Sequence, residues 1–347
     1  MKAVTVHAPG DLRVEEVDAP EPAPGEVLVR IVYGGICGSD LHYAADGRNG
    51  AYVVTEPLVL GHEVVGVVDR AGPDTPAAPP AGTRVAVHPA TPCAPAGAAT
   101  PTGLHLRPGG TYLGSASTHP HTQGGFTGLL AVGVERLREL PAALPLRRAV
   151  LAEPLAVALH AVGRLEGRVA GARVLVSGAG PIGVLAVAAL KRAGAAHVTA
   201  ADLQELPLRV ATAVGADEVV DLSRGGSLPE AGFDVVVEAA GVVPSLLAAI
   251  RAVRPGGSIL QLGILPAGPQ PVPVGELLSK EVALFGTQRF DTELDAAVEL
   301  LAADDSLDAV VTDVFGIEDA AAAFARARDS ANSSKTVLRI TPDPDDA

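Results

Sequence analysis

The sequence predicts an α/β protein that joins a β-rich domain to a doubly wound parallel sheet. From about Arg147 onward, strand and helix patterns alternate along the chain, which is typical of such a sheet. One strand-to-helix junction in this half carries the glycine pattern G-x-G-x-x-G, which begins at Gly178. Residues 1–145 instead show short strands separated by loops rich in Pro and Gly, which predicts a second domain of different architecture.

Length and composition limit the classes of protein to consider. A chain of 347 residues is long enough for two domains. Its net charge of −14 argues against nucleic acid and anionic membrane surfaces as partners. Hydrophobic residues make up 48% of the chain, but no run approaches the roughly 18 apolar residues of a membrane helix. Because two cysteines form no disulfide framework and no signal-peptide pattern is present, we expect a cytoplasmic protein.

In the first half, alternating apolar residues predict strands, and stretches rich in Pro and Gly predict loops. Loops are expected over Gly72–Gly82 and His88–Gly125, and irregular segments as long as the second are commonly functional. The strands expected here are Met1–Val6, Val27–Val32, Val64–Val68 and Arg84–Val87.

The second half predicts the elements of the parallel sheet and of the segment that follows it. Strands are expected at Arg173–Ser177, His197–Ala201, Glu218–Val220, Phe233–Glu238, Ser258–Leu262 and Thr336–Ile340. Helices are expected at Ile182–Arg192, Leu206–Val214, Pro244–Val253 and Thr292–Ala302. We expect the acidic, Pro-containing tail from Thr341 onward to fray.

The glycine pattern fits a dinucleotide-binding turn. Gly178 would allow the tight turn, Gly180 the approach of a pyrophosphate, and Gly183 close packing of helix and strand. The helix N-terminus would supply free N–H groups to that pyrophosphate. Asp202 ends the next strand about 20 residues later, where a carboxylate can accept from both ribose hydroxyls of NAD. With 39 glycines the pattern could arise by chance, but this strand, helix and acid favour the dinucleotide interpretation.

Candidate metal ligands lie in three separate stretches. Cys37 and the pair His62-Glu63 offer sulfur, nitrogen and oxygen donors, which together suit a catalytic Zn²⁺. Glu153 is an isolated acid in an apolar run. Each also has a structural interpretation: Cys37 as a small buried hydrophobe, His62 as a core histidine, Glu153 as a carboxylate at a helix N-terminus. Together, beside a dinucleotide-binding domain, they favour the metal.

These stretches resemble the zinc-dependent medium-chain dehydrogenases of the alcohol dehydrogenase superfamily, in particular the sorbitol and L-idonate dehydrogenase branch. The resemblance implies a GroES-like catalytic domain of residues 1–147 and 285–347, with a Rossmann NAD-binding domain of residues 148–284. It is carried, in family order across nearly the whole chain, by the stretches Gly35–Tyr43, Gly61–Gly66, Leu151–Val157, Gly178–Gly183 and Phe285–Phe290.

The resemblance also implies roles for individual residues. Cys37, His62 and Glu63 would ligate one catalytic zinc, with Glu153 as a further ligand or a water-mediated partner. Asp40 would orient the ligand histidine. The proton relay would be Ser39 and His42, the substrate residues Tyr43, Arg289 and Phe290, and the cofactor residues Gly178, Gly180, Pro181, Ile182, Gly183, Asp202, Gly263 and Thr287.

One departure concerns a second, structural zinc that many relatives hold on four cysteines spaced C-x2-C-x2-C-x7-C. Counted from Cys93, the other three positions are Ala96, Ala99 and Arg107, so three of the four ligands are absent. We therefore expect one zinc per subunit, and we expect Cys93 to be an unreactive thiol.

Asp202 would repel a 2′-phosphate and Leu203, Gln204 and Glu205 offer no cation, so NAD is favoured over NADP. The expected reaction oxidises a secondary hydroxyl of a polyol or sugar acid to a ketone. L-Idonate oxidised at C5 is preferred, and sorbitol, xylitol or a cyclitol remain alternatives. Two further classes stay open: a zinc-free quinone or enone reductase and a non-catalytic relative of the fold. By analogy we expect a homodimer or homotetramer, with an intersubunit sheet edge near Ser258–Leu262 or Leu284.

Overall fold

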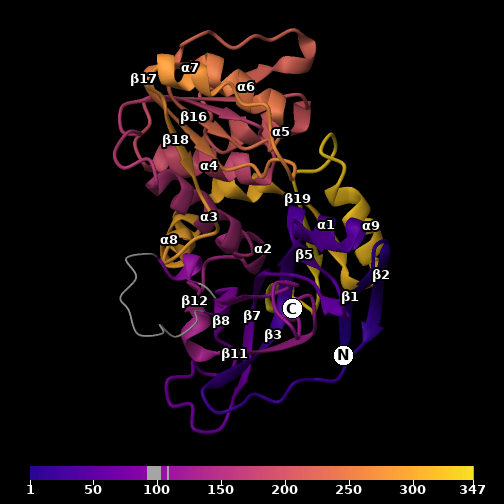
Figure 1. Cartoon of the computed structure of the whole chain (residues 1–347). Coiled ribbons are helices and arrows are strands. Elements are labelled where there is room, and N and C mark those ends of the chain that lie inside the picture. Colours follow the sequence, from indigo (N-terminus) through magenta and orange to yellow (C-terminus); the bar gives the residue numbers. More distant parts are fainter. Residues whose placement is uncertain (92–102, 108, 347) are drawn as a thin grey trace.

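The computed structural model describes residues 1–91, 103–107 and 109–346, and contains two sheet systems (Figure 1). A parallel sheet with its helices fills the upper half of the view, and the N-terminal strands fill the lower half. In the described part of the chain, no helix is long and apolar enough to cross a membrane.

The N-terminal region folds mainly into antiparallel strands, as the alternating apolar residues predict. Its large sheet has the order β12-β8-β7-β3-β20-β19, and β11 also pairs with β3. A smaller sheet has the order β2-β1-β6. The strands of this region are β1 (Lys2–Ala8), β2 (Asp11–Glu16), β3 (Glu26–Gly35), β4 (Arg48–Asn49), β5 (Tyr52–Val53), β6 (Leu58–Val59), β7 (Glu63–Ala71), β8 (Arg84–Val87), β9 (Ala90–Thr91), β10 (Thr111–Tyr112), β11 (Leu129–Gly133) and β12 (Leu137–Glu139). Its helices are α1 (Gly38–Asp46) and α2 (Leu146–Ala149).

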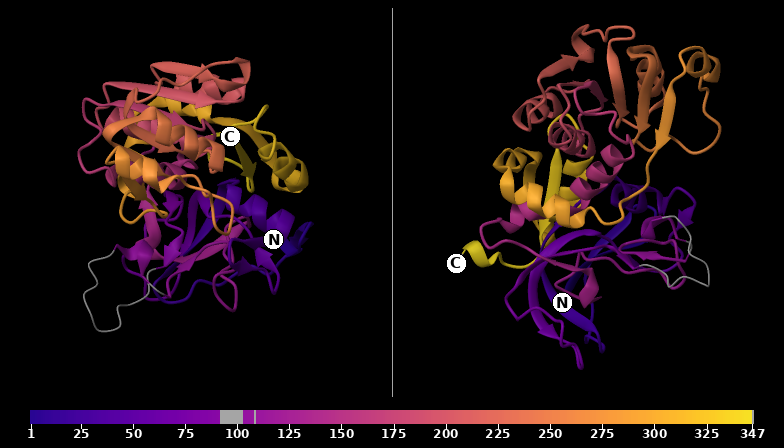
Figure 2. Two further views of the ribbon diagram at one scale, coloured as in Figure 1. Left: turned by 45° about the horizontal axis from the view of Figure 1, so that its top comes forward. Right: turned by 90° about the vertical axis from the view of Figure 1, so that its left-hand side faces the viewer.

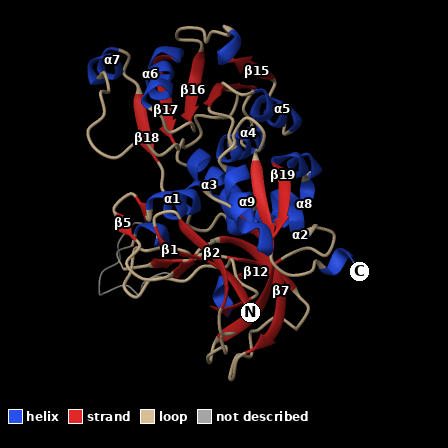
Figure 3. Ribbon diagram, turned by 90° about the vertical axis from the view of Figure 1, so that its right-hand side faces the viewer, coloured by secondary structure: helices blue, strands red, loops and turns tan. Residues whose placement is uncertain are grey.

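The parallel sheet of the second half of the chain has six strands in the order β15-β14-β13-β16-β17-β18. Numbered from its first strand this is 3-2-1-4-5-6, the order of a dinucleotide-binding Rossmann sheet. Its strands are β13 (Arg173–Ser177), β14 (His197–Asp202), β15 (Glu218–Asp221), β16 (Phe233–Glu238), β17 (Val253–Gln261) and β18 (Ala283–Gly286). The helices are α3 (Ala152–Gly163), α4 (Pro181–Arg192), α5 (Glu205–Ala213), α6 (Val243–Ala252) and α7 (Val274–Ser279) (Figure 3).

Two expected boundaries fall inside elements. The boundary expected after residue 147 lies within α2, and the one expected at 284/285 lies within β18, which ends at Gly286. The expected intersubunit edge also needs correction in part: β17 is paired on both sides, by β16 and β18, so it is internal. Of the two segments expected at that edge, only β18, which contains Leu284, is an edge strand.

After β18 the chain returns to the N-terminal sheet. The returning elements are α8 (Leu294–Ala303), β19 (Val311–Gly316), α9 (Ala320–Ala327) and β20 (Lys335–Arg339). β20 pairs antiparallel with β3, placing Leu338 opposite Gly34. The right-hand view of Figure 2 shows these C-terminal elements between the two sheet systems.

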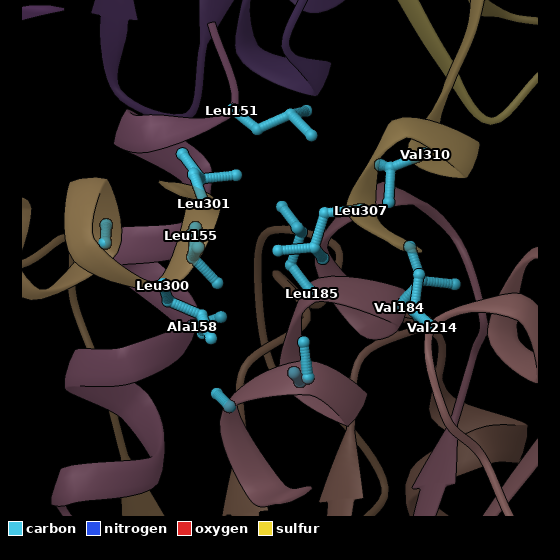
Figure 4. Close-up of a cluster of buried hydrophobic side chains, with 14 of the residues drawn as sticks. Leu151, Leu155, Ala158, Val184, Leu185, Val214, Leu300, Leu301, Leu307 and Val310 are labelled. Atoms are coloured by element: carbon cyan, nitrogen blue, oxygen red, sulfur yellow. The ribbon is translucent and has the colours of Figure 1, made fainter. Parts of the chain in front are cut away.

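A buried apolar cluster fixes α3 against its neighbours (Figure 4). Leu151, Leu155 and Ala158 follow one face of α3, and all three are inaccessible to solvent. They face Leu185 of α4 and Leu301 of α8 in the same cluster. Burying a leucine contributes about 1.5–3 kcal/mol. Because Glu153 lies in the first turn of α3, this packing also fixes the position of its backbone.

The expectation that the tail frays is wrong for the described residues 341–346. Thr341 donates its hydroxyl to the Ile31 carbonyl at 2.7 Å. Asp345 pairs with Arg84, and Asp346 pairs with Arg339 at 3.0 Å. The acidic residues that suggested a solvated tail therefore have basic partners on the sheet.

Candidate functional site

Three of the predicted metal ligands meet where β3 runs into α1 beside the start of β7. Gly35 at the end of β3 pairs with Glu63, so this register brings Cys37 close to His62 and Glu63. One ligand atom from each of Cys37, His62 and Glu63 lies within 4.8 Å of the others, and no other such group occurs among residues 1–91, 103–107 and 109–346. His62 and Glu63 are buried, and Cys37 is half-buried. The donor set of thiol, imidazole and carboxylate suits Zn²⁺.

The charges around this cluster favour a bound cation. Asp40 is fully buried and accepts from the N–H groups of Cys37 at 2.9 Å and Gly61 at 3.2 Å. Its Oδ1 lies 3.8 Å from Nδ1 of His62. Burial alone would lower the pKa of His62, but the charges of Asp40 and Cys37 outweigh it and raise that pKa to about 10. A site that favours a positive charge this strongly fits a divalent metal ion.

Lys335 at the start of β20 is a member of the site that sequence reasoning missed. It is 3% exposed and pairs with Glu63, and its ammonium also donates to the Ile36 carbonyl at 2.9 Å. Burial raises the pKa of Glu63 to about 7, with Lys335 acting in the opposite direction. A lysine at the start of an apolar strand was the only signal in the sequence, and it is equally typical of a solvated strand end.

Glu153 lies beside the three-ligand group rather than within it. The Tyr112 hydroxyl donates to Glu153 Oε1 at 2.5 Å, and both side chains are buried. The Tyr112 ring lies 5.6 Å from the His62 ring, measured between centroids. The Arg289 guanidinium stacks on the Tyr112 ring, with its central carbon 3.9 Å from the ring centroid. Tyr112 therefore connects Glu153 and the predicted substrate residue Arg289 to the group of candidate metal ligands, called the metal cluster below. Because it lies in the long predicted loop, no periodicity pointed to it.

The glycine turn has the geometry that a dinucleotide needs. Gly178 has φ +98°, a conformation that favours glycine, and a Cβ on Gly183 would lie 1.9 Å from the Gly178 carbonyl oxygen. Gly180 caps the N-terminus of α4, and a Cβ there would meet no atom within 4 Å. Pro181 and Ile182 open the helix. The free space at Gly180, next to the unpaired N–H groups of α4, fits a pyrophosphate.

Other predicted cofactor residues lie at the carboxyl ends of the parallel strands. Asp202 ends β14, and its carboxylate accepts from the N–H groups of Ala179 at 2.7 Å and Leu203 at 2.7 Å. Gly263 follows β17, where a Cβ would lie 2.3 Å from the Gly241 nitrogen. The Thr287 hydroxyl is buried and has no hydrogen-bond partner among the described residues, which fits a contact that a cofactor would complete.

The predicted relay and substrate residues differ in exposure. Ser39 is half-buried and His42 is exposed, 3.4 Å from Asp46, so the two lead along α1 from the metal cluster to solvent. Tyr43 is 2% exposed, and its hydroxyl accepts from Ala116 N–H at 3.1 Å. Phe290 is 1% exposed and its ring contacts His88. The substrate roles of Tyr43 and Phe290 stay predictions.

The positions expected for the absent structural zinc are only partly described. Cys93, Ala96 and Ala99 lie outside the described residues, so the expectations for them stay predictions. Arg107, the fourth position, is described and half-buried.

Two family models match successive parts of the chain. Residues 23–142 match the alcohol dehydrogenase GroES-like domain, and residues 181–303 match the zinc-binding dehydrogenase model. Sorbitol dehydrogenase from Macaca fascicularis is 34% identical over 332 residues, which cover 93% of this chain and 91% of the relative. The chain belongs to the zinc-dependent medium-chain dehydrogenases. Within that family it lies in the sorbitol and L-idonate branch.

Further relatives place this dehydrogenase in the same branch. L-Idonate 5-dehydrogenase (NAD(P)(+)) from Escherichia coli K12 is 36% identical over 279 residues, 79% of this chain and 80% of the relative. The crystal structure of an E. coli L-idonate 5-dehydrogenase has a TM-score of 0.87 at 31% identity, covering 98% of each chain.

Nicotinamide cofactors occur in structural neighbours of this dehydrogenase. A Sinorhizobium meliloti protein solved with NADP has a TM-score of 0.86 at 29% identity, covering 98% of this chain and 99% of that one. An E. coli CFT073 protein solved with NADH has a TM-score of 0.82 at 28% identity, with the same two coverages. This chain is therefore an NAD(P)-dependent alcohol or polyol dehydrogenase rather than a non-catalytic relative of the fold.

Proposed function

We propose that this dehydrogenase oxidises a secondary hydroxyl of a polyol or sugar acid to a ketone, with L-idonate oxidised at C5 as the preferred reaction. The observation that carries the proposal is the cluster of half-buried Cys37 with buried His62 and Glu63, beside the stacked pair Tyr112 and Arg289. Arg289 supplies a cation that stacks on Tyr112, whose ring lies 5.6 Å from that of His62, and a cation here favours an acidic or polyhydroxylated substrate. Sorbitol, xylitol and cyclitols are the alternatives.

We propose one zinc per subunit, held by Cys37, His62 and Glu63 with Glu153 in reach. When bound, the metal supplies a positive charge that makes a substrate hydroxyl more acidic, and the nicotinamide accepts the hydride. Asp40 fixes the orientation of His62 through its buried carboxylate. Ser39 and His42 carry the substrate proton from the half-buried end of α1 to solvent. A zinc-free reductase would have no need of this ligand set.

We propose NAD as the working cofactor, held by the turn Gly178, Gly180, Pro181, Ile182 and Gly183. Asp202 supports this choice because its carboxylate is fixed by N–H groups beside the turn, where it would repel a 2′-phosphate. Thr287 offers an unpartnered hydroxyl to the nicotinamide end, and Gly263 follows a neighbouring strand of the sheet.

We propose residues 1–147 with 285–347 as the catalytic domain and residues 148–284 as the NAD domain.

We propose that the protein forms a homodimer or a homotetramer. Apolar residues around edge strand β18 support the oligomer, because exposed strand edges are usually covered. Leu284, Leu278 and Ile264 are 47%, 73% and 86% exposed. Light scattering of wild type and Leu278→Glu tests this, and a wild-type monomer would overturn it. The cysteine usage of the sequence supports the cytoplasm as the working compartment.

The test of the proposed reaction is an initial-rate panel of sugar acids, polyols and cyclitols with NAD and with NADP, before and after chelation. We expect chelator-sensitive oxidation of L-idonate with NAD. Activity on sorbitol, xylitol or a cyclitol instead would keep the reaction and change the substrate. Protein that carries zinc but oxidises none of these compounds would overturn the proposed substrate class.

A further inference from the structure

A cavity of about 170 Å³ lies between the β9–β10 pair, the start of β12 and the segment 289–292. Four arginines line it: Arg107, Arg136, Arg138 and Arg289. The whole chain has a net charge of −14, so its average field repels anions and this cavity is a local exception. At this volume the cavity is smaller than the roughly 300–1,000 Å³ of pockets for drug-sized ligands, so it suits a small group.

Three of these arginines, Arg107, Arg136 and Arg289, have no carboxylate partner among the described residues, and only Arg138 has one. Arg107 makes no ion pair within the described residues, and its Nε is buried without a hydrogen-bond partner. Arg289 stacks on Tyr112 and also makes no ion pair within that part of the chain. A buried guanidinium N–H without an acceptor is costly, so Arg107 Nε indicates a missing acceptor in the cavity.

Of the other two arginines, Arg136 adds to the positive charge of the cavity, whereas Arg138 is paired with a carboxylate. Arg136 is bonded to main-chain oxygens only, those of His88 at 2.9 Å and Pro89 at 3.0 Å, so these bonds hold its position without neutralising it. Burial lowers the pKa of Arg136 to about 10, the effect expected for a cation without a full counter-charge. Arg138 pairs with Asp295 at 2.9 Å.

Two carboxylates also line the cavity but do not cancel its charge. Glu135 is exposed, so water screens its interaction with the arginines. Asp291 lies with its carboxylate against Gly103, beside His105. The four lining guanidinium groups therefore stand against three carboxylates: Glu135 in solvent, Asp291, and the Asp295 carboxylate that pairs with Arg138.

We propose that this cavity is a binding site for a small oxyanion, a phosphate or carboxylate group, recognised chiefly by Arg107 and Arg289. Arginine favours such groups because its planar fork donates two parallel N–H bonds to two oxygens. Arg107 stands at the fourth position of the absent four-cysteine pattern. The position that ligates a metal cation in many relatives would therefore bind the proposed anion in this chain. The oxyanion is either a free ion or the acidic end of a substrate held at the metal cluster, which Arg289 borders through Tyr112.

The first test is calorimetric titration of the purified holoenzyme with inorganic phosphate. We expect saturable binding with a Kd of about 1 mM or tighter, which Arg107→Gln weakens about tenfold, equivalent to about 1.4 kcal/mol. Arg251→Gln is the matched control, because it removes one positive charge from an exposed arginine outside the cavity. Arg107→Lys keeps the charge but not the fork, so we expect an intermediate loss. Absent binding in wild type, or equal binding in wild type and Arg107→Gln, would overturn the site.

A second arm separates the two sources of the anion and rests on the proposed function. If the site holds the acidic end of a substrate, phosphate competes with L-idonate, and Arg107→Gln raises KM for L-idonate but not for a neutral polyol. If the site holds a free ion, phosphate changes the rates with both substrates in a non-competitive manner. Phosphate binding does not require turnover, so failure of the proposed reaction would leave the first test intact.

Discussion

Tyr112→Phe removes one hydroxyl from the contact between the metal cluster and α3. In the wild type this hydroxyl donates to Glu153 at 2.5 Å, and Tyr112 and Glu153 are only 6% and 7% exposed. The phenylalanine fills nearly the same volume, so the change isolates the hydrogen bond. Glu153 would stay buried and lose the hydrogen bond that the Tyr112 hydroxyl donates to it.

The geometry sets the size of the expected effect. A short O–H···O⁻ bond to a buried carboxylate is among the stronger hydrogen bonds, and bonds to charged groups contribute about 1.5–3 kcal/mol. If Glu153 acts at the metal, that energy corresponds to a fall in kcat/KM, or in zinc affinity, of about 10- to 100-fold. We would measure kcat/KM by initial rates and zinc affinity by competition with a chelator.

Tyr33→Phe is the matched control, because Tyr33 is 5% exposed, and burial and the nearby Asp343 raise the pKa of its hydroxyl, so this change also removes a buried hydroxyl beside a carboxylate. Both variants should lose stability to denaturant, but only Tyr112→Phe should lose activity or zinc affinity. If Tyr112→Phe keeps kcat/KM and zinc affinity within twofold of Tyr33→Phe, then Glu153 does not act through Tyr112.

Cys37→Ser should reduce bound zinc from about one equivalent toward zero, measured by atomic absorption after dialysis; a full equivalent would contradict the ligand assignment. Asp202→Asn should raise KM for NAD about tenfold and reduce the preference over NADP, and an unchanged cofactor ratio would refute its role. Burial alone would raise the pKa of Glu293, but bonds from His160 and the Asp291 N–H lower it to about 2. The ionised Glu293 carboxylate therefore stabilises the fold above pH 4.5, and this stabilisation is lost as the pH falls toward 2. The pKa shift limits the stabilisation to about 3.4 kcal/mol, and solvent screening reduces it to about 1–2 kcal/mol. Urea midpoints should then separate Glu293→Gln from wild type most at pH 7 and by a smaller margin at pH 3, whereas a constant gap would count against the pair.

Most of the parallel sheet could be predicted from the sequence because its signals are local. The strands over Arg173–Ser177 and Phe233–Glu238 have the predicted bounds, since β-branched runs there end at glycine or polar turns. β17 was predicted from Ser258 but begins at Val253. Pro255, Gly256 and Gly257 suggest a turn, and in the fold they lie in an irregularity between Val253 and Ser258, both of which pair with β16. The prediction that the tail frays was wrong because two of its contacts, Asp345 with Arg84 and Thr341 with Ile31, join residues that lie far apart in the sequence.

The site divides in the same way. Cys37, His62 and Glu63 come from stretches that resemble the family, and the register of β3 with β7 brings them together. Lys335 and Tyr112 were missed because their roles depend on tertiary contacts: a lysine that is polar in the sequence is 3% exposed in the fold. A buried charge of this kind is visible only once its partner is placed.

The pairing of β20 with β3 also affects how the protein is made. Glu63 and its partner Lys335 are 272 residues apart, which a ribosome covers in roughly 14 to 54 s at about 5–20 residues per second. During that interval the first strands are already synthesised, but the strand that completes their sheet does not yet exist. The Rossmann sheet, whose six strands are all contributed by residues 173–286, can form before it. The sheet beside Cys37, His62 and Glu63 is therefore the last part of the fold to be completed.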